Sequence, residues 1–411
     1  EKRFSANESV AGVADGTEAS GASNRTIWGN FGQIALLKER YPHLRVSIAV
    51  GGWTLSAHFS AVLATEEGRE HASTSLVEFL ERYDMFDGVD FDWEYPGGGG
   101  LGGNTASAQD GTNYALFLSR VREKLDVLSN TTGHRYQISV ASPAGFGQIQ
   151  NFNLEELHGI IDFFNVMTYD LHGTWESVTG HLAAMENDPV GYDISTAVRL
   201  YLEAGVPREK IVLGFPLYTR AWKGVAAGDD GGYAASAAGA AAGSFLDQNG
   251  MYDYKDLLGR LRAAGSTWQL YWDDDAQAAY LYDSGQSIFS SFETPGTVAL
   301  KSEWAQSMGL GGMMFWDLSS DITGDPESLV TAAAQSWYKG LSFDQIVSGS
   351  SLEFDYILGG NGRFDAIAEA DTVAVDLGNP VGESDEESTP EPSDTNDETA
   401  PNPQPEEETV P

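Results

Sequence analysis

A ten-residue stretch in the first quarter of the chain alternates acidic and apolar side chains: Asp87-Gly88-Val89-Asp90-Phe91-Asp92-Trp93-Glu94-Tyr95-Pro96. Successive side chains of a β-strand point to opposite faces, and residues on one face lie roughly 6.5–7 Å apart. Asp90, Asp92 and Glu94 therefore share one face, and the apolar residues between them share the other. The pattern predicts a strand that stacks three acids on one face and buries the other against helices.

Three carboxylates this close cannot all ionise at low energy, so the group is expected to retain a proton. The terminal acid, Glu94, is the natural donor of that proton, which is the task of a general acid in glycoside cleavage. Two other interpretations compete: a solvated strand face, or a site for Mg²⁺ or Ca²⁺. Phe91 and Trp93 argue against the first. The Gly-rich segment after Pro96 supplies no further ligands, which argues against the second.

The stretch resembles the D-G-x-D-x-D-x-E signature of the family 18 glycoside hydrolases, the chitinases, and matches every fixed position. The resemblance extends over roughly residues 28–340. A second segment, Gly51-Gly52-Trp53, is similar to the S-x-G-G-W strand end of the same family. Ala49 stands where that family usually has Ser, so a hydroxyl near the site is missing.

Buried strands alternate with helices along the chain, which is typical of a parallel sheet. Polar and aromatic residues at successive strand ends favour a (β/α)8 TIM barrel, an α/β fold. Six strands are predicted, so the first two barrel strands are expected upstream, outside this chain. The predicted strands cover residues 45–50, 87–93, 136–142, 162–168, 211–215 and 312–316.

Residues 223–300 break the regular spacing and are rich first in Ala and Gly and then in aromatic residues. They resemble the small α+β insertion that many family 18 chitinases place before the last barrel strand, where it walls one side of the cleft. The remaining segments are predicted as follows: a loop or disordered segment at 1–27, barrel at 28–222 and 301–340, an unassigned appended unit at 341–378, and an acidic, Pro-rich linker at 379–411.

The chain carries 61 acidic and 23 basic residues, a net charge of −38. Such a chain is a poor partner for nucleic acid or an anionic membrane, so an uncharged polymer is the better expectation. Most of the acids precede the tail, which suggests adaptation to high salt. The chain has no Cys, and no apolar run is long enough to span a membrane. A secreted monomer is expected, although no signal peptide is visible, and a carbohydrate-binding module beyond the linker is possible.

The resemblance implies substrate-assisted catalysis with no cofactor. Glu94 protonates the glycosidic oxygen, and the N-acetyl carbonyl of the sugar attacks the anomeric carbon. Asp92 orients the acetamide, Asp90 shares a proton with Asp92, and Tyr169 hydrogen-bonds the acetamide oxygen. Asp87, which opens the motif, is expected to be structural.

The resemblance and the strand-end positions also suggest substrate-binding residues: Trp53, Tyr95, Met167, Asp170, Trp175, Tyr218, Arg220 and Trp316. Trp93, Trp222 and Trp272 are further candidates. Core packing competes with sugar stacking for each Trp other than Trp316, and for Tyr169. Arg220 has two possible roles, contacting sugar or pairing with a barrel carboxylate.

These observations together predict a chitinase that cleaves β-1,4 bonds between N-acetylglucosamine units with retention. Three alternatives remain: a non-catalytic chitin-binding lectin of the same fold, an endo-β-N-acetylglucosaminidase acting on N-glycans, and a metal-dependent hydrolase. Lectins of this fold usually lack the terminal Glu of the motif, whereas Glu94 is present.

Overall fold

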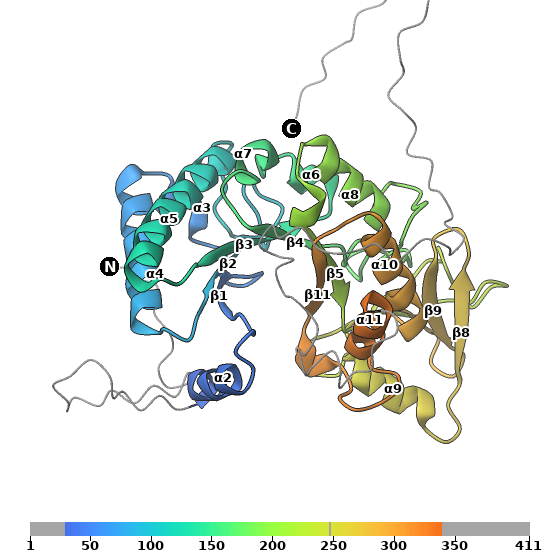
Figure 1. The fold of residues 1–411 in the computed structure, drawn as a ribbon. Helices are drawn as coiled ribbons and strands as arrows, with labels where there is room; N and C mark the ends of the chain where they lie inside the picture. Colours follow the sequence, from blue (N-terminus) through green and yellow to red (C-terminus); the bar gives the residue numbers. More distant parts are fainter. Residues whose placement is uncertain (1–28, 246–247, 339–411) are drawn as a thin grey trace, which may run out of the picture. The chain divides into compact units, whose positions relative to one another are not determined.

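The computed structural model describes residues 29–245 and 248–338. The segments predicted at 1–27, 341–378 and 379–411 lie outside these residues. The main sheet is parallel, follows the order β1-β2-β3-β4-β5-β11, and curls around its concave side (Figure 1). Its strands are β1 (Ser47–Gly51), β2 (Gly88–Asp92), β3 (Gln137–Pro143), β4 (Phe163–Met167), β5 (Ile211–Pro216) and β11 (Gly312–Trp316). These are the six predicted strands, and the curled sheet confirms a partial (β/α)8 barrel.

Helices connect the strands, and α4 and α5 lie together on the outer side of the sheet (Figure 1). The helices are α2 (Gly29–Arg40), α3 (Phe59–Leu63), α4 (Glu66–Arg82), α5 (Asp110–Thr132), α6 (Phe146–Ile149), α7 (Leu154–Leu157), α8 (Ile194–Glu203), α9 (Tyr254–Arg262), α10 (Pro295–Ser307) and α11 (Leu329–Trp337), with single 3-10 turns η1 (Arg208–Lys210) and η2 (Leu318–Ser320).

The start of helix α10 is fixed by side chains of its first turn. The Thr294 hydroxyl accepts a hydrogen bond from the Thr297 backbone N–H, and the Thr297 hydroxyl accepts one from the Thr294 backbone N–H. Pro295 is the first residue of the helix. This is a capping box with Thr in place of the usual Glu or Gln.

The predicted α+β insertion is confirmed as a second, antiparallel sheet of order β7-β6-β10-β9-β8, accompanied by α9. It lies between β5 and β11 in the chain and draws its first strand from residues just after β5. Its strands are β6 (Arg220–Lys223), β7 (Gly239–Ala240), β8 (Trp268–Asp273), β9 (Ala278–Asp283) and β10 (Ile288–Phe292).

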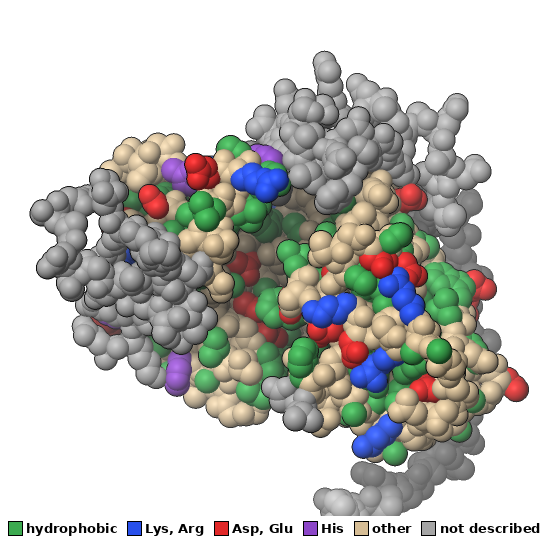
Figure 2. Space-filling view, turned by 90° about the horizontal axis from the view of Figure 1, so that it is seen from below, with side chains coloured by type: hydrophobic (Ala, Val, Ile, Leu, Met, Phe, Trp, Pro, Cys, Tyr) green, Lys and Arg blue, Asp and Glu red, His purple; other side chains and the backbone are tan. Residues whose placement is uncertain are grey.

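The apolar face predicted for β2 packs outward against helices. The ring of Phe91 meets that of Phe117 edge-on at 5.2 Å, and the ring of Trp93 stacks on that of Phe59 at 5.2 Å. Trp93 and Trp222 are at most 1% exposed, so their assignment as candidate cleft residues was wrong. The acidic face of β2 consequently faces the concave side. Figure 2 shows that the molecule is hollowed when seen from below, with acidic and hydrophobic side chains deep in the hollow.

A buried lysine of α10 pairs with an acid just before the helix and also binds the loop that follows β4. Lys301 donates hydrogen bonds to Glu293 and to the backbone carbonyl of Ala183, and the Lys301 and Glu293 side chains are only 1% and 2% exposed. Removing one partner of a buried pair leaves the other charge without compensation.

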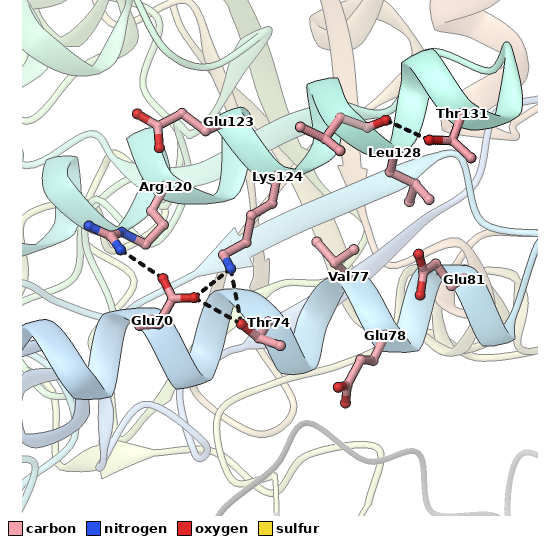
Figure 3. Close-up of a pocket in the computed structure, with 11 residues that line it drawn as sticks. Glu70, Thr74, Val77, Glu78, Glu81, Arg120, Glu123, Lys124, Leu128 and Thr131 are labelled. Carbon is pink, nitrogen blue, oxygen red and sulfur yellow. Dashed lines mark hydrogen bonds and ion pairs between the residues drawn. The ribbon is translucent and has the colours of Figure 1, made fainter.

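We therefore expect Lys301→Met to lower the free energy of unfolding by about 3–5 kcal/mol, measured by urea denaturation. Lys124→Met is the matched control. It removes the exposed ion pair with Glu70 in the groove between α4 and α5 (Figure 3), where Glu70 also accepts a hydrogen bond from Arg120. An exposed pair contributes no more than about 1 kcal/mol. Equal losses in the two variants would contradict this account.

Candidate active site

The residues singled out from the sequence gather where the strands of the main sheet end. Asp90 and Asp92 lie on β2 and Glu94 follows it directly, Met167 ends β4, and Trp316 ends β11. Carboxyl ends of parallel strands meet at one edge of a barrel, which is where active sites of this architecture are built. Most of the other predicted residues follow the ends of β1, β2, β4 and β5, and Arg220 begins β6.

Asp87 lies at the opposite end of β2 and acts structurally there. Its Oδ2 accepts hydrogen bonds from Lys38 Nζ and from the Val46 backbone N–H, both at 2.6 Å. These bonds join α2 and the start of β1 to β2. Asp87 thus fixes the strand that carries the acid row and takes no part in the row itself.

Asp90 is the deepest acid of the row and is held by two neighbouring strands. Its Oδ1 accepts hydrogen bonds from Ser139 Oγ at 2.5 Å and Asn165 Nδ2 at 2.9 Å. Burial raises the pKa of Asp90, although both hydrogen bonds lower it. Sequence reasoning missed Ser139 and Asn165. The available signal was that each is a polar residue inside an otherwise apolar strand, on β3 and β4 respectively.

Asp92, the middle acid, has a buried oxygen, Oδ1, without a hydrogen-bond partner among the described residues. Burial, together with the neighbouring charges of Glu94 and Asp90, raises the pKa of Asp92 to about 8. A buried acceptor without a donor is unfavourable unless a ligand supplies one. Asp92 is therefore suited to accept a hydrogen bond from an N–H or O–H group of a bound molecule.

The two glycines that end β1 allow close packing against Asp92. Gly51 has φ of +116°, and a Cβ there would lie 2.1 Å from the Asp92 carbonyl oxygen. The Gly52 backbone N–H donates to that same oxygen at 2.6 Å. This contact explains in physical terms why the strand end carries Gly-Gly before Trp53.

Glu94, the terminal acid, is only 8% exposed. Its backbone N–H donates to the Ser56 hydroxyl at 2.9 Å, a contact that the sequence did not suggest. The pKa of Glu94 is raised to about 7, chiefly by burial and in part by the charge of Asp170, against the lowering effect of a hydrogen bond from Tyr95. The carboxyl group therefore carries a proton for a large part of the time at neutral pH, as a general acid must.

Arg220 and Asp170 form a bidentate pair beside the acid row. Arg220 Nε lies 2.7 Å from Asp170 Oδ1, and the Arg220 Nη2 lies 2.6 Å from Oδ2. The guanidinium also lies over the rings of Trp175 and Tyr218, 5.3 and 5.4 Å from their centroids. Of the two roles expected for Arg220, these distances describe pairing with a carboxylate. A bidentate Arg pair is rigid, so it fixes the carboxylate of Asp170.

Tyr169 lies at the end of β4 beside this pair. Its ring meets that of Tyr218 edge-on at 6.2 Å, and its hydroxyl contacts the sulfur of Met314 at 3.7 Å, a residue that the sequence did not single out. Burial and the carboxylates around it raise the pKa of Tyr169 well above its ordinary value. The phenol therefore stays protonated and is available as a hydrogen-bond donor.

Large aromatic surfaces remain open to solvent at the strand ends. Trp53, Trp175 and Trp316 are 47%, 61% and 54% exposed, so core packing does not account for them. Trp272 is also exposed, on β8 of the insertion. Exposed rings beside polar groups are suited to stack on the apolar faces of sugars.

Residues 29–245 and 248–338 lack the features of two other classes of protein. No group of three or more His, Cys, Asp or Glu side chains in these ranges is arranged to hold a metal ion. No helix there is both long enough and apolar enough for a membrane span.

The family model described as glycosyl hydrolases family 18 matches residues 5–321. Chitinase A1 of Niallia circulans is 39% identical over 316 residues, which cover 74% of this chain and 44% of that protein. Chitinase 1 of Aphanocladium album is 34% identical over 310 residues, with 74% and 68% covered. This chain thus spans less than half of the first relative and about two thirds of the second.

Among solved structures, chitinase ChiA74 from Bacillus thuringiensis aligns with a TM-score of 0.72 at 33% identity, covering 81% of this chain and 57% of that one. A family 18 N-acetylglucosaminidase from Paenibacillus barengoltzii aligns with a TM-score of 0.67 at 31% identity, covering 77% and 88%.

Proposed function

Since the chain belongs to glycosyl hydrolases family 18, we propose that it is a chitinase, hydrolysing β-1,4 bonds between N-acetylglucosamine units with retention of configuration. The observation that carries the proposal is the acid row at the carboxyl end of β2. Burial keeps a proton on this row at neutral pH, with the pKa of Glu94 raised to about 7. Relatives named as chitinases support chitin as the substrate.

The proposed reaction has two steps. Glu94 gives its proton to the glycosidic oxygen while the carbonyl oxygen of the substrate's own N-acetyl group bonds to the anomeric carbon and the glycosidic bond breaks. A cyclic oxazolinium ion forms and the shortened sugar chain leaves with a free hydroxyl. Glu94, now ionised, then takes a proton from water as that water opens the ring. Two displacements at one carbon retain its configuration.

The neighbouring residues stabilise this intermediate. The unpartnered Oδ1 of Asp92 accepts the acetamide N–H and offsets the positive charge of the oxazolinium ion. Asp90 shares a proton with Asp92, and the protonated phenol of Tyr169 donates to the acetamide oxygen. Trp316 stacks beneath the reacting sugar, with Met167 beside its acetyl methyl. Trp53, Trp175, Tyr95, Asp170, Tyr218 and Arg220 complete the sugar-binding cleft.

Incubation with chitohexaose, with and without EDTA, tests this function. Cleavage that is insensitive to chelation supports substrate assistance. EDTA-sensitive cleavage would favour a metal-dependent hydrolase, and binding without cleavage a lectin. Release of single N-acetylglucosamine units would place this chain nearer to the Paenibacillus barengoltzii enzyme, which is described as an N-acetylglucosaminidase. Cleavage of N-glycans in place of chitohexaose would indicate an endo-β-N-acetylglucosaminidase.

The proposal includes the setting in which the enzyme works. The enzyme acts as a secreted monomer, and residues 223–300 wall one side of the cleft. The net charge of −38 supports function at high salt concentration. Loss of activity at low ionic strength would support adaptation to salt, and indifference to salt would count against it.

The pH profile follows from the role of Glu94. The general acid must be protonated before each turnover, and it loses its proton as the pH rises through about 7, its pKa. We therefore expect kcat/KM on a soluble chito-oligosaccharide, which reports the free enzyme, to fall about tenfold per pH unit well above that value. A rate that stays constant up to pH 9 would contradict general-acid catalysis by Glu94.

A further inference from the structure

Trp175 is largely exposed, yet its ring has a defined position. One face lies over the guanidinium of Arg220, with the centroid 5.3 Å away. Gly173 lies so close beneath the ring that a Cβ at this residue would be 2.1 Å from Trp175 Cζ3. The backbone of the loop after β4 must therefore keep one conformation from 173 to 176, although this segment contributes little to the apolar core.

His172 supplies what fixes this loop. Its Nδ1 lies 2.9 Å from Glu176 Oε2 and its Nε2 lies 2.8 Å from Asp188 Oδ2. The His172 side chain is 15% exposed and that of Asp188 is 5% exposed. The edge of the Tyr192 ring also contacts the imidazole, 6.1 Å between centroids. One imidazole thus bridges two carboxyl groups that are separated by twelve residues in the sequence.

Only some protonation states of His172 and its two partners allow both contacts to be hydrogen bonds. A neutral imidazole has one N–H donor and one acceptor nitrogen, and an ionised carboxylate can only accept. Both contacts are hydrogen bonds only if the ring carries two protons or one carboxyl group carries one. With two protons on the ring, both contacts become charge-assisted hydrogen bonds, which are stronger than neutral ones.

Both carboxyl groups also hold backbone. Glu176 Oε2 accepts the Gly173 backbone N–H at 3.2 Å, and Asp188 Oδ1 accepts those of Val190 and Tyr192 at 2.9 and 3.0 Å. The turns at 173–176 and 188–192 are therefore joined through the imidazole. Trp175 lies inside the first of these turns.

We propose that His172 is a positioning residue that, bridging Glu176 and Asp188, holds Trp175 in place to bind a sugar of the chitin chain. The inference rests on the proposed function, because a fixed Trp175 matters only if its exposed ring binds substrate. The bridge acts on binding more than on bond cleavage, since it touches neither the acid row nor the reacting sugar. The aromatic stack that it preserves is expected to be worth about tenfold in KM.

A double-mutant cycle of His172→Asn and Trp175→Ala, with chitohexaose as substrate, tests the proposal. His172→Asn should raise KM about tenfold and change kcat less than about threefold. In the Trp175→Ala background the same substitution should change KM by less than about twofold. An unchanged KM, or an equal rise in both backgrounds, would overturn the proposal.

His134→Asn is the matched control, because the His134 ring also contacts a carboxylate, Asp87 at 3.1 Å, but at the opposite end of the strands. It should leave KM unchanged, and a rise equal to that of His172→Asn would count against a specific role. Should His172→Asn fail to fold, Glu176→Gln removes the charge of one bridge partner and is expected to raise KM in the same way.

Hydrogen–deuterium exchange tests the His172 bridge independently of the proposed function, because the measurement needs no substrate. In His172→Asn, backbone amides within 173–192 should exchange about tenfold faster than in the wild type, with those of β3 unchanged. Unchanged exchange in 173–192 would overturn the bridge whatever the enzyme cleaves. Faster exchange in His172→Asn, together with a wild-type protein that cleaves no chitohexaose, would contradict the proposed function and support the bridge.

Discussion

Replacing Glu94 with Gln is expected to lower turnover of chitohexaose by about 10²–10⁴-fold. The amide keeps the shape of the carboxyl group but has no proton to give to the glycosidic oxygen. The side chain is almost fully buried, so no water molecule takes over the role efficiently. Steady-state kinetics on a soluble chito-oligosaccharide measure the loss directly.

Binding separates this chemical effect from a damaged site. Calorimetric titration of the Glu94→Gln variant with chitohexaose should give a Kd within a few-fold of the wild-type value, since the aromatic surfaces that bind the sugar are unchanged. Glu70→Gln is the matched control, because Glu70 lies on the outer helix α4 in an exposed ion pair. It should retain wild-type turnover. A Glu94→Gln variant with near-normal turnover would refute the role of Glu94.

Asp92→Asn is expected to have two opposite effects, the first of which is a fall in kcat of about 10²–10³-fold. As positive charge develops on the substrate, Asp92 passes its proton to Asp90, and the resulting carboxylate orients the acetamide and offsets that charge. A neutral amide does neither well. Kinetics on chitohexaose measure this loss, and an unchanged kcat would contradict the assignment.

The second effect of Asp92→Asn is a gain in stability that grows with pH. The folded pKa of Asp92, about 8, lies above the ordinary value near 4, so between these values the folded state binds more protons than the unfolded state. Wild-type stability therefore falls as the pH rises from about 4 to about 8, and Asn removes this contribution.

Melting temperatures at pH 4.5, 6 and 8 test the second effect. The Tm of Asp92→Asn should match that of the wild type near pH 4.5 and exceed it increasingly toward pH 8. Asp126→Asn, a substitution at an exposed residue of α5, should show no such trend. A Tm difference that does not change with pH would mean that Asp92 ionises as easily in the folded state as in the unfolded state.

The alternation of residues along 87–94 was sufficient to predict the acid row, because the period of a strand is a local property. The same alternation places Trp93 on the buried face of the strand, so it could have been excluded from the cleft candidates on the sequence alone. Exposure of Trp53, Trp175 and Trp316 depends on which helices and loops cover each strand end. Composition and periodicity do not contain that information.

The partners of the site residues were mostly beyond prediction because they come from distant parts of the chain. Ser139 and Asn165 reach Asp90 through the register of β3 and β4 with β2, 49 and 75 residues away. Arg220 meets Asp170 across 50 residues, and only the resemblance to a family suggested that both belong to one site. Whether Arg220 contacts sugar or pairs with a carboxylate depends on the folded geometry, and the sequence alone could not decide between these two roles.

The configuration of the first product tests the central claim most directly, because it reports how the anomeric carbon is attacked. Proton NMR of chitohexaose during the first minutes of cleavage resolves the α- and β-anomers of the new reducing end before they interconvert. Attack by the substrate's own acetamide, with Glu94 as proton donor, predicts the β-anomer. Initial formation of the α-anomer would show direct displacement by water and would contradict this account.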